Sequence, residues 1–143
     1  LELDDERMEQ NNLRFQRTYR EIEKNEIRYE EINTDDCDYL LVAFGSMARI
    51  CQKVMEIAQE EGLKLGLLRP ITLWPFPYEQ IKKSSRNAKG ILVVELSAGQ
   101  MIEDVKLAVE CKVDVKHYGR LGGIVPTPEE VLDSLKEQFS INK

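Results

Sequence analysis

Residues 39–46 read Tyr-Leu-Leu-Val-Ala-Phe-Gly-Ser, and this stretch decides the fold. The run from Tyr39 to Phe44 has the length of a strand and lacks polar alternation, which is typical of a strand buried on both faces of a sheet. Gly45 ends the run, and Ser46 is a preferred N-cap residue for a following helix. That helix is indicated by an apolar stripe at helical spacing, formed by Met47, Ile50, Val54 and Ile57. A buried strand that leads directly into an amphipathic helix predicts an α/β fold.

The same strand–helix unit recurs on the C-terminal side of this stretch. Further strands are predicted at 65–68, 91–94 and 113–118. Helices are predicted at 78–87, 102–109 and 128–139. Upstream, residues 27–32 alternate in part and predict an edge strand. Because right-handed crossovers place such helices on both faces of a mainly parallel sheet, we expect a three-layer α/β/α sandwich of five strands.

Several helix ends carry recognisable signals. Gly62 is a C-terminal glycine, and Pro77 stands where the first residue of a helix is often proline. Ser97 and Gln100 have the spacing of a capping box. Thr127, Pro128 and Glu130 combine an N-cap, a first-turn proline and a capping-box glutamate.

The N-terminal part differs in composition from the rest. Residues 1–38 hold 13 acidic and 6 basic side chains, a net charge of −7, whereas the whole chain carries −6. Residues 4–25 predict a charged helix with one apolar stripe, formed by Met8, Asn12, Phe15, Tyr19 and Ile22. We therefore divide the chain into a linker helix at 1–25 and an α/β domain at 26–143. The stripe either packs on this domain or docks on another domain or chain, and a homodimer through it is possible.

Composition excludes several classes of protein. The acidic N-terminal part argues against a nucleic-acid partner. No apolar run approaches the ~20 residues of a membrane span, and the first residues lack the basic start and apolar centre of a signal peptide. The absence of an initiator Met favours a piece of a longer protein. The cysteines are far apart and form no Cys-x-x-Cys pair, which predicts inert thiols in a reducing cytoplasm and no metal site.

Candidate ligand-binding loops lie where strands end, because ligands of open parallel sheets gather at the carboxyl ends of the strands. The turn at 45–46 places a helix N-terminus where an anion can bind. In the loop at 119–123, glycines allow close backbone approach and an arginine adds a fixed charge. Plain structural turns explain both loops as well. The possible anion-binding residues are Gly45, Ser46, Gly119, Arg120, Gly122 and Gly123.

The stretch Leu73-Trp74-Pro75-Phe76-Pro77 fixes the only tryptophan and a phenylalanine on a loop stiffened by two prolines. We expect one ring to point inward and the other towards an adjoining domain or subunit, although a core plug explains the pair too. Glu95, at the end of a buried strand, is a further candidate. The only histidine, His117, is expected near the sheet edge and not as a catalytic base. The possible interface residues are Trp74, Pro75, Phe76, Pro77, Glu95, Phe15, Tyr19 and Ile22.

Four strings of the sequence together resemble a known family. They are LLVAFGSMAR, GLKLGLLRPITLWPFP, ILVVELSAGQMIEDVKLAV and YGRLGGIVPTPEEV. They resemble the C-terminal domain of the alpha subunit of 2-oxoacid:ferredoxin oxidoreductases, and above all that of the 2-ketoisovalerate enzymes. The resemblance covers residues 25–139. It implies a fold similar to the transketolase C-terminal domain, with strand order 1-3-2-4-5 and an antiparallel first strand at 27–32.

The resemblance also implies the chemistry of the parent enzyme. That family converts a 2-oxoacid, coenzyme A and oxidised ferredoxin into an acyl-CoA, CO2 and reduced ferredoxin. Thiamine diphosphate, Mg2+ and iron–sulfur clusters are implied for the parent complex and none for this domain, since its sequence lacks the Gly-Asp-Gly and Asn signature and the cluster cysteines. No catalytic residue is expected here.

The implied partners are the preceding thiamine-type domain of the same subunit, the beta and gamma or ferredoxin-like subunits, and, at the level of the complex, ferredoxin and coenzyme A. The domain would serve assembly and frame the active site. The alternative is a small-molecule module that binds the phosphates of coenzyme A at the carboxyl edge of the sheet. The residues leave the identity of the 2-oxoacid open.

Overall fold

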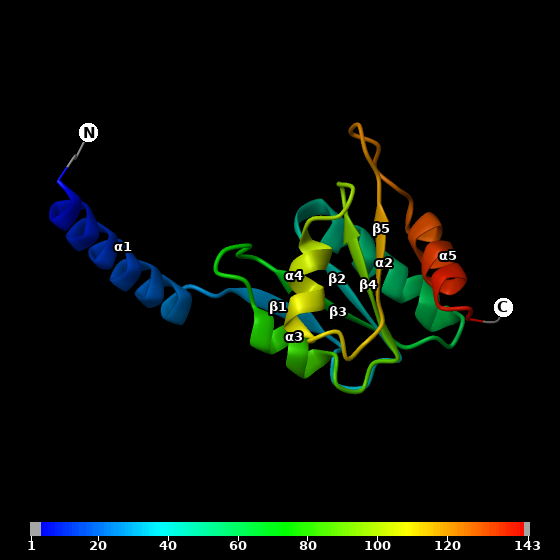
Figure 1. The fold of residues 1–143 in the computed structure, drawn as a ribbon. Coiled ribbons are helices and arrows are strands. Elements are labelled where there is room, and N and C mark those ends of the chain that lie inside the picture. The colour runs from blue at the N-terminus through cyan, green and yellow to red at the C-terminus, as the bar shows by residue number, and fades with distance from the viewer. Residues whose placement is uncertain (1–3, 142–143) are drawn as a thin grey trace.

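A computed structural model describes residues 4–141 of the protein, and a five-stranded sheet forms its centre (Figure 1). The strands are β1 (Tyr29–Ile32), β2 (Tyr39–Ala43), β3 (Leu65–Pro70), β4 (Gly90–Glu95) and β5 (Val115–Gly119). They lie in the order β1-β3-β2-β4-β5, with β1 antiparallel to β3 and the other neighbours parallel. The predicted sheet order and direction are confirmed. Residues 1–3 of the predicted linker segment and 142–143 of the predicted domain lie outside the described residues.

Helices cover both faces of the sheet. They are α1 (Asp5–Asn25), α2 (Gly45–Glu60), α3 (Tyr78–Ser84), α4 (Met101–Ala108) and α5 (Pro128–Gln138). Figure 1 shows α2 and α5 on one face and α3 and α4 on the other, so the predicted three layers are confirmed. Among residues 4–141, no helix is long and apolar enough to cross a membrane.

Two cores hold the layers together, one on each face of the sheet. Along β2, Leu41 packs with α2 and α5, whereas Leu40 packs with α3 and α4. On β4, Leu92 belongs to the core with α2 and α5, and Ile91 belongs to the core with α3 and α4. Successive side chains of a strand point to opposite faces, so an uninterrupted apolar run is needed when both faces are covered. This requirement explains why residues 39–44 lack polar alternation.

The edge strand β1 is fastened to the domain by Glu31. The hydroxyl of Ser84 donates to Oε1 of Glu31 at 2.6 Å, and Gln80 and Thr34 also donate to this carboxylate. Burial alone raises the pKa of Glu31, but these hydrogen bonds hold it below its ordinary value. A charged side chain therefore ties a short, exposed edge strand to α3.

Three predicted helix caps are wrong in detail. The N-cap of α2 is Phe44, and Ser46 lies inside the first turn because Gly45, with φ at +58°, already begins the helix. Pro77 is itself the N-cap of α3. Ser97 caps no helix, because α4 begins at Met101. The capping box between Thr127 and Glu130, which opens α5, is confirmed.

Helix α1 projects away from the domain (Figure 1). An N-cap stabilises its start, where Asp4 accepts a hydrogen bond from the backbone N–H of Arg7 at 3.0 Å. No residue from Asp5 to Asn25 is buried. Helices in proteins gain most of their stability from tertiary packing. We therefore describe α1 as an arm and expect it to pack against a partner surface.

Candidate functional site: the carboxyl edge of the sheet

Four loops leave the carboxyl ends of the parallel strands, at 44–46, 71–77, 96–100 and 120–127. The strand order β3-β2-β4-β5 sets these loops along one edge of the domain (Figure 1). This edge is the expected place for a functional site in a parallel α/β sheet. It carries most of the residues proposed from the sequence.

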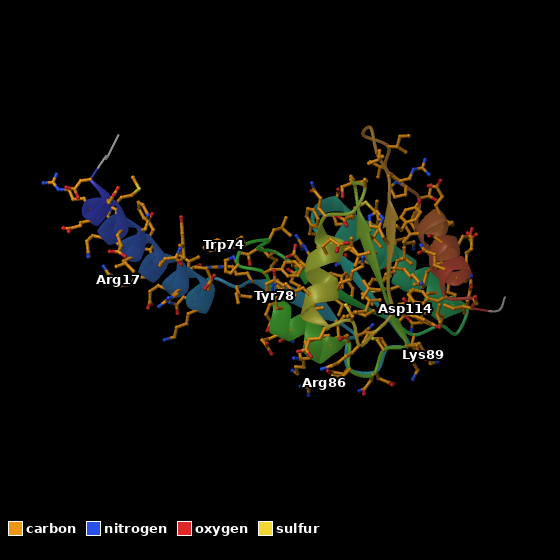
Figure 2. The ribbon with its side chains drawn as sticks, viewed as in Figure 1. Arg17, Trp74, Tyr78, Arg86, Lys89 and Asp114 are labelled. Carbon is orange, nitrogen blue, oxygen red and sulfur yellow. The ribbon has the colours of Figure 1, made fainter. Side chains whose placement is uncertain are left out.

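The loop after β3 directs its two aromatic rings in opposite ways. Phe76 is 5% exposed and belongs to the core under α3 and α4, and its neighbours Pro75 and Pro77 are buried too. Trp74 is 55% exposed and meets the ring of Tyr19 on α1 edge-on, with the centroids 5.6 Å apart. Figure 2 places Trp74 between the arm and the body of the domain. Of this loop's predicted interface residues, only Trp74 keeps a free surface.

Thr72 fixes the loop after β3 to the start of the domain. The backbone N–H of Arg28 donates to the hydroxyl of Thr72 at 3.0 Å. That hydroxyl donates in turn to the carbonyl of Pro75 at 2.9 Å, and the peptide bond between Trp74 and Pro75 is cis. The hydroxyl of Thr72 therefore helps to set the direction of Trp74, and no sequence motif indicates this role.

Glu95 holds the amino end of α4. Its carboxylate is buried, with 2% exposure, and accepts hydrogen bonds from the backbone N–H groups of Gln100, Met101 and Ile102 at 3.1–3.3 Å. The hydroxyl of Ser97 also donates to it, at 2.9 Å. The first N–H groups of a helix have no partner inside the helix, and a carboxylate also suits the positive end of the helix dipole. Glu95 is thus engaged as the cap of α4.

His117 lies next to this carboxylate on β5. Its Nε2 atom is 3.4 Å from Oε1 of Glu95, but this atom is buried and, among residues 4–141, has no partner of hydrogen-bond geometry. The sequence prediction that His117 sits in a strand at the sheet edge is confirmed, since β5 is the edge strand opposite β1. Its place beside Glu95 follows from the register of β4 and β5, which pairs Val93 with His117 and Glu95 with Gly119.

A small cavity of about 130 Å³ opens beside Glu95. It is lined by Phe44, Leu73, Phe76, Glu95, Gln100, Met101 and Asp104. Near it, the hydroxyl of Tyr78 donates to Oδ1 of Asp104 at 2.6 Å, which joins α3 to α4. This hydrogen bond, with a contribution from burial, raises the pKa of Tyr78 to about 12. The cavity has room for only a few waters and is too small for a cofactor.

The Tyr78–Asp104 bond gives a testable prediction at high pH. Because the folded protein keeps the Tyr78 proton above the ordinary pKa of tyrosine, this bond stabilises the fold below about pH 10 and the contribution is lost as pH rises towards 12. In an absorbance titration of the 5 tyrosines, one ring should ionise near pH 12. Tyr78→Phe should remove this late step, and Asp104→Ala should move it to lower pH. A late step that survives Tyr78→Phe would contradict the assignment.

The two proposed anion-binding loops are separated by β4, because the strand order is β2-β4-β5. At the first, Gly45 and Ser46 are exposed, and α2 begins without a side-chain cap. At the second, Gly122 and Gly123 adopt positive φ angles with open space around them. There Arg120 forms an ion pair with Glu130 at 3.3 Å, so its charge is partly balanced within the chain. The sheet brings each loop to the edge but does not join them into one site.

Exposed apolar side chains lie in three of the loops at this edge, and we name this set of residues the docking edge. Each is at least 41% exposed. They follow β3, β4 and β5, and they are Ile71, Leu73, Trp74, Leu96, Leu121, Ile124 and Val125. Extended exposed apolar surfaces rimmed by polar groups mark interaction sites. The sequence reasoning proposed Trp74 but missed the other six, whose only signal is a large apolar residue directly after a strand.

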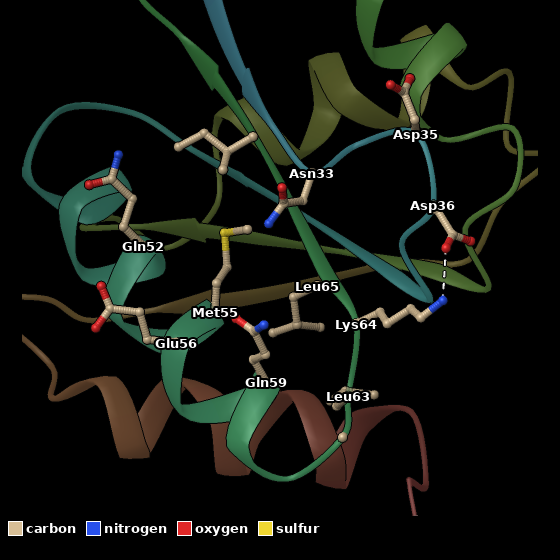
Figure 3. Close-up of a pocket in the computed structure, with 12 residues that line it drawn as sticks. Asn33, Asp35, Asp36, Gln52, Met55, Glu56, Gln59, Leu63, Lys64 and Leu65 are labelled. Atoms are coloured by element: carbon tan, nitrogen blue, oxygen red, sulfur yellow. Dashed lines mark hydrogen bonds and ion pairs between the residues drawn. The ribbon is translucent and has the colours of Figure 1, made fainter.

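A second hollow lies at the opposite, amino edge of the sheet (Figure 3). It measures about 870 Å³ and lies between α2, the turn after β1 and the start of β3. Met55 and Leu65 form part of its floor, and Asp36, which pairs with Lys64 at 2.7 Å, lies on its rim. Over residues 4–141, no group of three or more His, Cys, Asp or Glu is placed to hold a metal ion.

A protein-family model matches most of this chain. The model described as pyruvate:ferredoxin oxidoreductase core domain II matches residues 37–131. Among curated proteins, the ketoisovalerate oxidoreductase subunit VorB of Methanothermobacter thermautotrophicus is 40% identical over 135 residues, which are 94% of this chain and 38% of that protein. The 2-oxoglutarate synthase subunit KorA of Methanothermobacter marburgensis is 29% identical over 71% of this chain and 27% of that protein. The chain therefore spans well under half the length of these relatives.

Solved structures share the fold. A 2-oxoglutarate:ferredoxin oxidoreductase from Magnetococcus marinus, solved with 2-oxoglutarate, coenzyme A and succinyl-CoA bound, superimposes with a TM-score of 0.75 at 18% identity, over 96% of this chain and 24% of that one. The alpha chain of a probable 2-oxoacid ferredoxin oxidoreductase from Thermoplasma acidophilum gives a TM-score of 0.52 at 28% identity, over 79% of this chain and 97% of that one. A split-gene transketolase, solved as an inactive beta4 tetramer, gives a TM-score of 0.67 at 16% identity, over 81% of this chain and 42% of that one.

Proposed function

Because the chain belongs to the family of the pyruvate:ferredoxin oxidoreductase core domain II, we propose that it is the C-terminal domain of the alpha subunit of a 2-oxoacid:ferredoxin oxidoreductase. The identity to a ketoisovalerate oxidoreductase subunit supports a branched-chain 2-oxoacid as the substrate of the whole enzyme. The reaction would convert this acid, coenzyme A and oxidised ferredoxin into the acyl-CoA, CO2 and reduced ferredoxin. We place this enzyme in the cytoplasm.

We assign the redox and decarboxylation chemistry to other parts of the enzyme. The cysteines of this domain do not fit a cluster, because Cys37 and Cys51 lie in opposite cores and Cys111 is exposed alone. Iron–sulfur clusters need several thiolates together. Burial raises the pKa of Cys51 to about 12, which disfavours the thiolate form that a metal requires. Thiamine diphosphate, Mg2+ and the clusters would be held by the thiamine-type domain and by the beta and gamma or ferredoxin-like subunits.

One observation carries the proposal: at the carboxyl edge of the sheet, polar side chains are engaged within the domain, whereas apolar side chains are exposed. The polar groups that could do chemistry there, Glu95 and Tyr78, make hydrogen bonds inside the domain. The apolar groups, by contrast, face outward. Such a surface suits contact with a neighbouring domain or subunit and not turnover of a bound substrate. The domain would thereby frame the active site and support assembly.

Trp74 tests this role, because its exposed ring should be an anchor of the interface. In the full-length subunit, Trp74→Ala should leave the free energy of unfolding nearly unchanged and should weaken binding of the beta subunit by at least about tenfold. Phe76→Ala should instead destabilise the domain by about 3 kcal/mol, since it opens a cavity in the core. Co-purification with a tagged beta subunit and chemical denaturation measure the two effects.

Leu107 provides the matched control for Trp74. It is 68% exposed on α4 and does not belong to the docking edge, so Leu107→Ala should affect neither assembly nor stability. An intact complex with Trp74→Ala would refute the interface. Equal loss of assembly with Leu107→Ala would show that any exposed apolar change disturbs the complex.

One observation favours a second candidate function, the binding of an anion such as a phosphate of coenzyme A. Helix α2 begins with no side-chain cap and no acidic residue in its first turn, so its N–H groups at Gly45 and Ser46 remain available. The loop with Gly122 and Gly123 offers further open backbone. Calorimetry with coenzyme A tests this candidate, and the absence of heat at about millimolar ligand would remove it.

A further inference from the structure

The cavity beside Glu95 is continuous with the docking edge. Leu73, an exposed member of the docking edge, forms part of its wall. The buried side chains of Phe76 and Met101 also line it, together with the half-buried ring of Phe44. A partner seated on Leu73 would therefore also reach this cavity.

Two carboxylates line this cavity, those of Glu95 and Asp104, and none of the lining side chains is basic. The hydrogen bonds to both carboxylates come from neutral donors. They are backbone N–H groups and the hydroxyl of Ser97 for Glu95, and the hydroxyl of Tyr78 for Asp104. Such bonds satisfy the oxygen atoms but bring no positive charge, and the dipole of α4 offers only about half an elementary charge.

The negative charge at the cavity is left unbalanced by the rest of the described chain. Within residues 4–141, Asp104 forms no ion pair, and the one basic group at ion-pair distance from Glu95 is His117, which carries charge only when protonated. Covering the cavity with an apolar partner would remove water from these carboxylates without compensation, which is costly. Charge complementarity therefore favours a cation as the occupant.

The walls and the size of the cavity favour the guanidinium group of an arginine. Phe44 and Phe76 supply aromatic rings, which attract cations. Compared with the ammonium of lysine, a guanidinium stacks better on such rings, is more weakly hydrated and offers several N–H donors to a carboxylate. The cavity measures about 130 Å³, and since a water occupies about 30 Å³ in the liquid, it holds about four non-hydrogen atoms. A guanidinium group has one carbon and three nitrogens.

We propose that this cavity is an anchor pocket for one arginine side chain of the subunit that covers the docking edge. The guanidinium would donate to Asp104 and lie against the rings of Phe44 and Phe76, and its methylene stem would lie against Leu73. The docking edge itself is apolar, so this charged point would fix the position of the partner on it. The identity of the occupant rests on the proposed function, whereas the preference for a guanidinium is a property of this chain alone.

Titration of the 143-residue chain with n-propylguanidinium chloride tests the pocket without the partner. In amide NMR spectra at constant ionic strength, the probe should cause saturable shifts at Leu73, Gln100, Met101 and Asp104, with a Kd of about 1–10 mM. n-Propylurea, which has the same shape without the charge, should bind at least about tenfold more weakly. n-Butylammonium, which imitates lysine, should also bind more weakly.

Asp104→Asn and Glu103→Gln form a matched pair of variants for this titration. Asp104→Asn keeps the shape and an acceptor oxygen for Tyr78 but removes the charge, and it should weaken binding of n-propylguanidinium at least about fivefold. Glu103 precedes it on α4, is exposed and pairs with Lys106, so Glu103→Gln should leave binding unchanged. The same spectra show whether each variant is folded.

Four results of the titration overturn the pocket. They are the absence of saturable shifts at these amides, equal affinity for n-propylurea, tighter binding of n-butylammonium, and equal loss of binding in Glu103→Gln. If the probe fails to bind while Trp74→Ala still weakens assembly, the pocket is refuted and the docking edge stands.

Assembly of the full-length subunit with a tagged beta subunit tests the occupant. Asp104→Asn should weaken this binding at least about fivefold, whereas Glu103→Gln should not. Added salt should weaken assembly of the wild type more than that of Asp104→Asn, because the variant lacks the charge pair. If the probe binds but Asp104→Asn assembles like the wild type, no arginine of the neighbouring subunit fills the pocket and the proposal falls.

Discussion

Glu95→Ala is expected to lower the free energy of unfolding by about 4 kcal/mol. The carboxylate is the common acceptor for three backbone N–H groups at the start of α4. Removing it leaves the N–H groups of Met101 and Ile102 buried without partners, and each unsatisfied buried donor costs about 1–3 kcal/mol. Water entering through the adjacent 130 Å³ cavity would recover only part of this loss.

Glu95→Gln separates charge from shape. Its amide keeps one acceptor oxygen but turns an NH2 group towards backbone donors, so we expect a loss about half as large as with alanine. Glu103→Ala is the control within the same helix, because Glu103 is exposed and only pairs with Lys106 at 2.9 Å. It should cost less than about 1 kcal/mol.

Urea denaturation measures the three losses, and hydrogen exchange locates them. Exchange at Gln100, Met101 and Ile102 should accelerate in Glu95→Ala while the amides of β4 keep their protection. Unchanged exchange at these three residues, or a loss no larger than that of Glu103→Ala, would contradict the capping role of Glu95.

The architecture was predictable because a buried parallel strand has a composition of its own. The uninterrupted run at 39–44 and the run at 91–94 are β2 and β4, the two central strands of the sheet. Edge strands were placed less well. β5 was expected at 113–118 but spans Val115–Gly119, because one of its sides has no neighbouring strand to define where pairing starts. The antiparallel direction of β1 followed only from the family resemblance.

Helix caps could be predicted from the sequence only where the group that accepts the first N–H hydrogen bonds of the helix lies within the capping motif itself. Thr127 and Glu130 form their capping box as expected. Ser97 and Gln100 do not, because the N–H of Gln100, which the hydroxyl of Ser97 would accept in such a box, donates instead to the carboxylate of Glu95 at the end of β4, the stronger acceptor. The spacing of Ser97 and Gln100 reveals nothing of this, since the buried acceptor lies outside the four-residue window.

The direction of each aromatic ring in the loop after β3 also exceeded what sequence can specify. The two prolines indicated a stiff loop, and the rings of Trp74 and Phe76 were expected to point in opposite directions. Which ring faces inward depends on the anchor between Thr72 and Arg28, residues 44 positions apart along the chain. The structure buries Phe76 and exposes Trp74. The docking edge therefore became visible only when the strand ends were assembled along one side of the sheet.

Gly119→Ala is the second change with a large expected effect, about 3 kcal/mol of lost stability. A Cβ atom at this position would lie 2.2 Å from the carbonyl oxygen of Ser97 and 2.5 Å from Cε1 of His117. Real Cβ atoms do not approach other atoms so closely, so β5 and the loop after Glu95 must separate. Because Gly119 pairs with Glu95 in the register of the sheet, this movement also strains the cap of α4.

Two variants decide whether the obstacle is the backbone or the imidazole. In Gly119→Ala/His117→Ala the ring is gone but the Ser97 carbonyl remains, so less than half of the lost stability should return. Gly122→Ala is the control for backbone strain alone, because Gly122 has φ at +66° with nothing within 4 Å, and it should cost only about 1 kcal/mol. Full recovery in the double variant would show that the ring, and not the close approach of two backbones, requires glycine at the end of β5. Urea denaturation of the three variants measures these differences, and if Gly119→Ala proves no worse than Gly122→Ala, the close packing of the carboxyl edge is refuted.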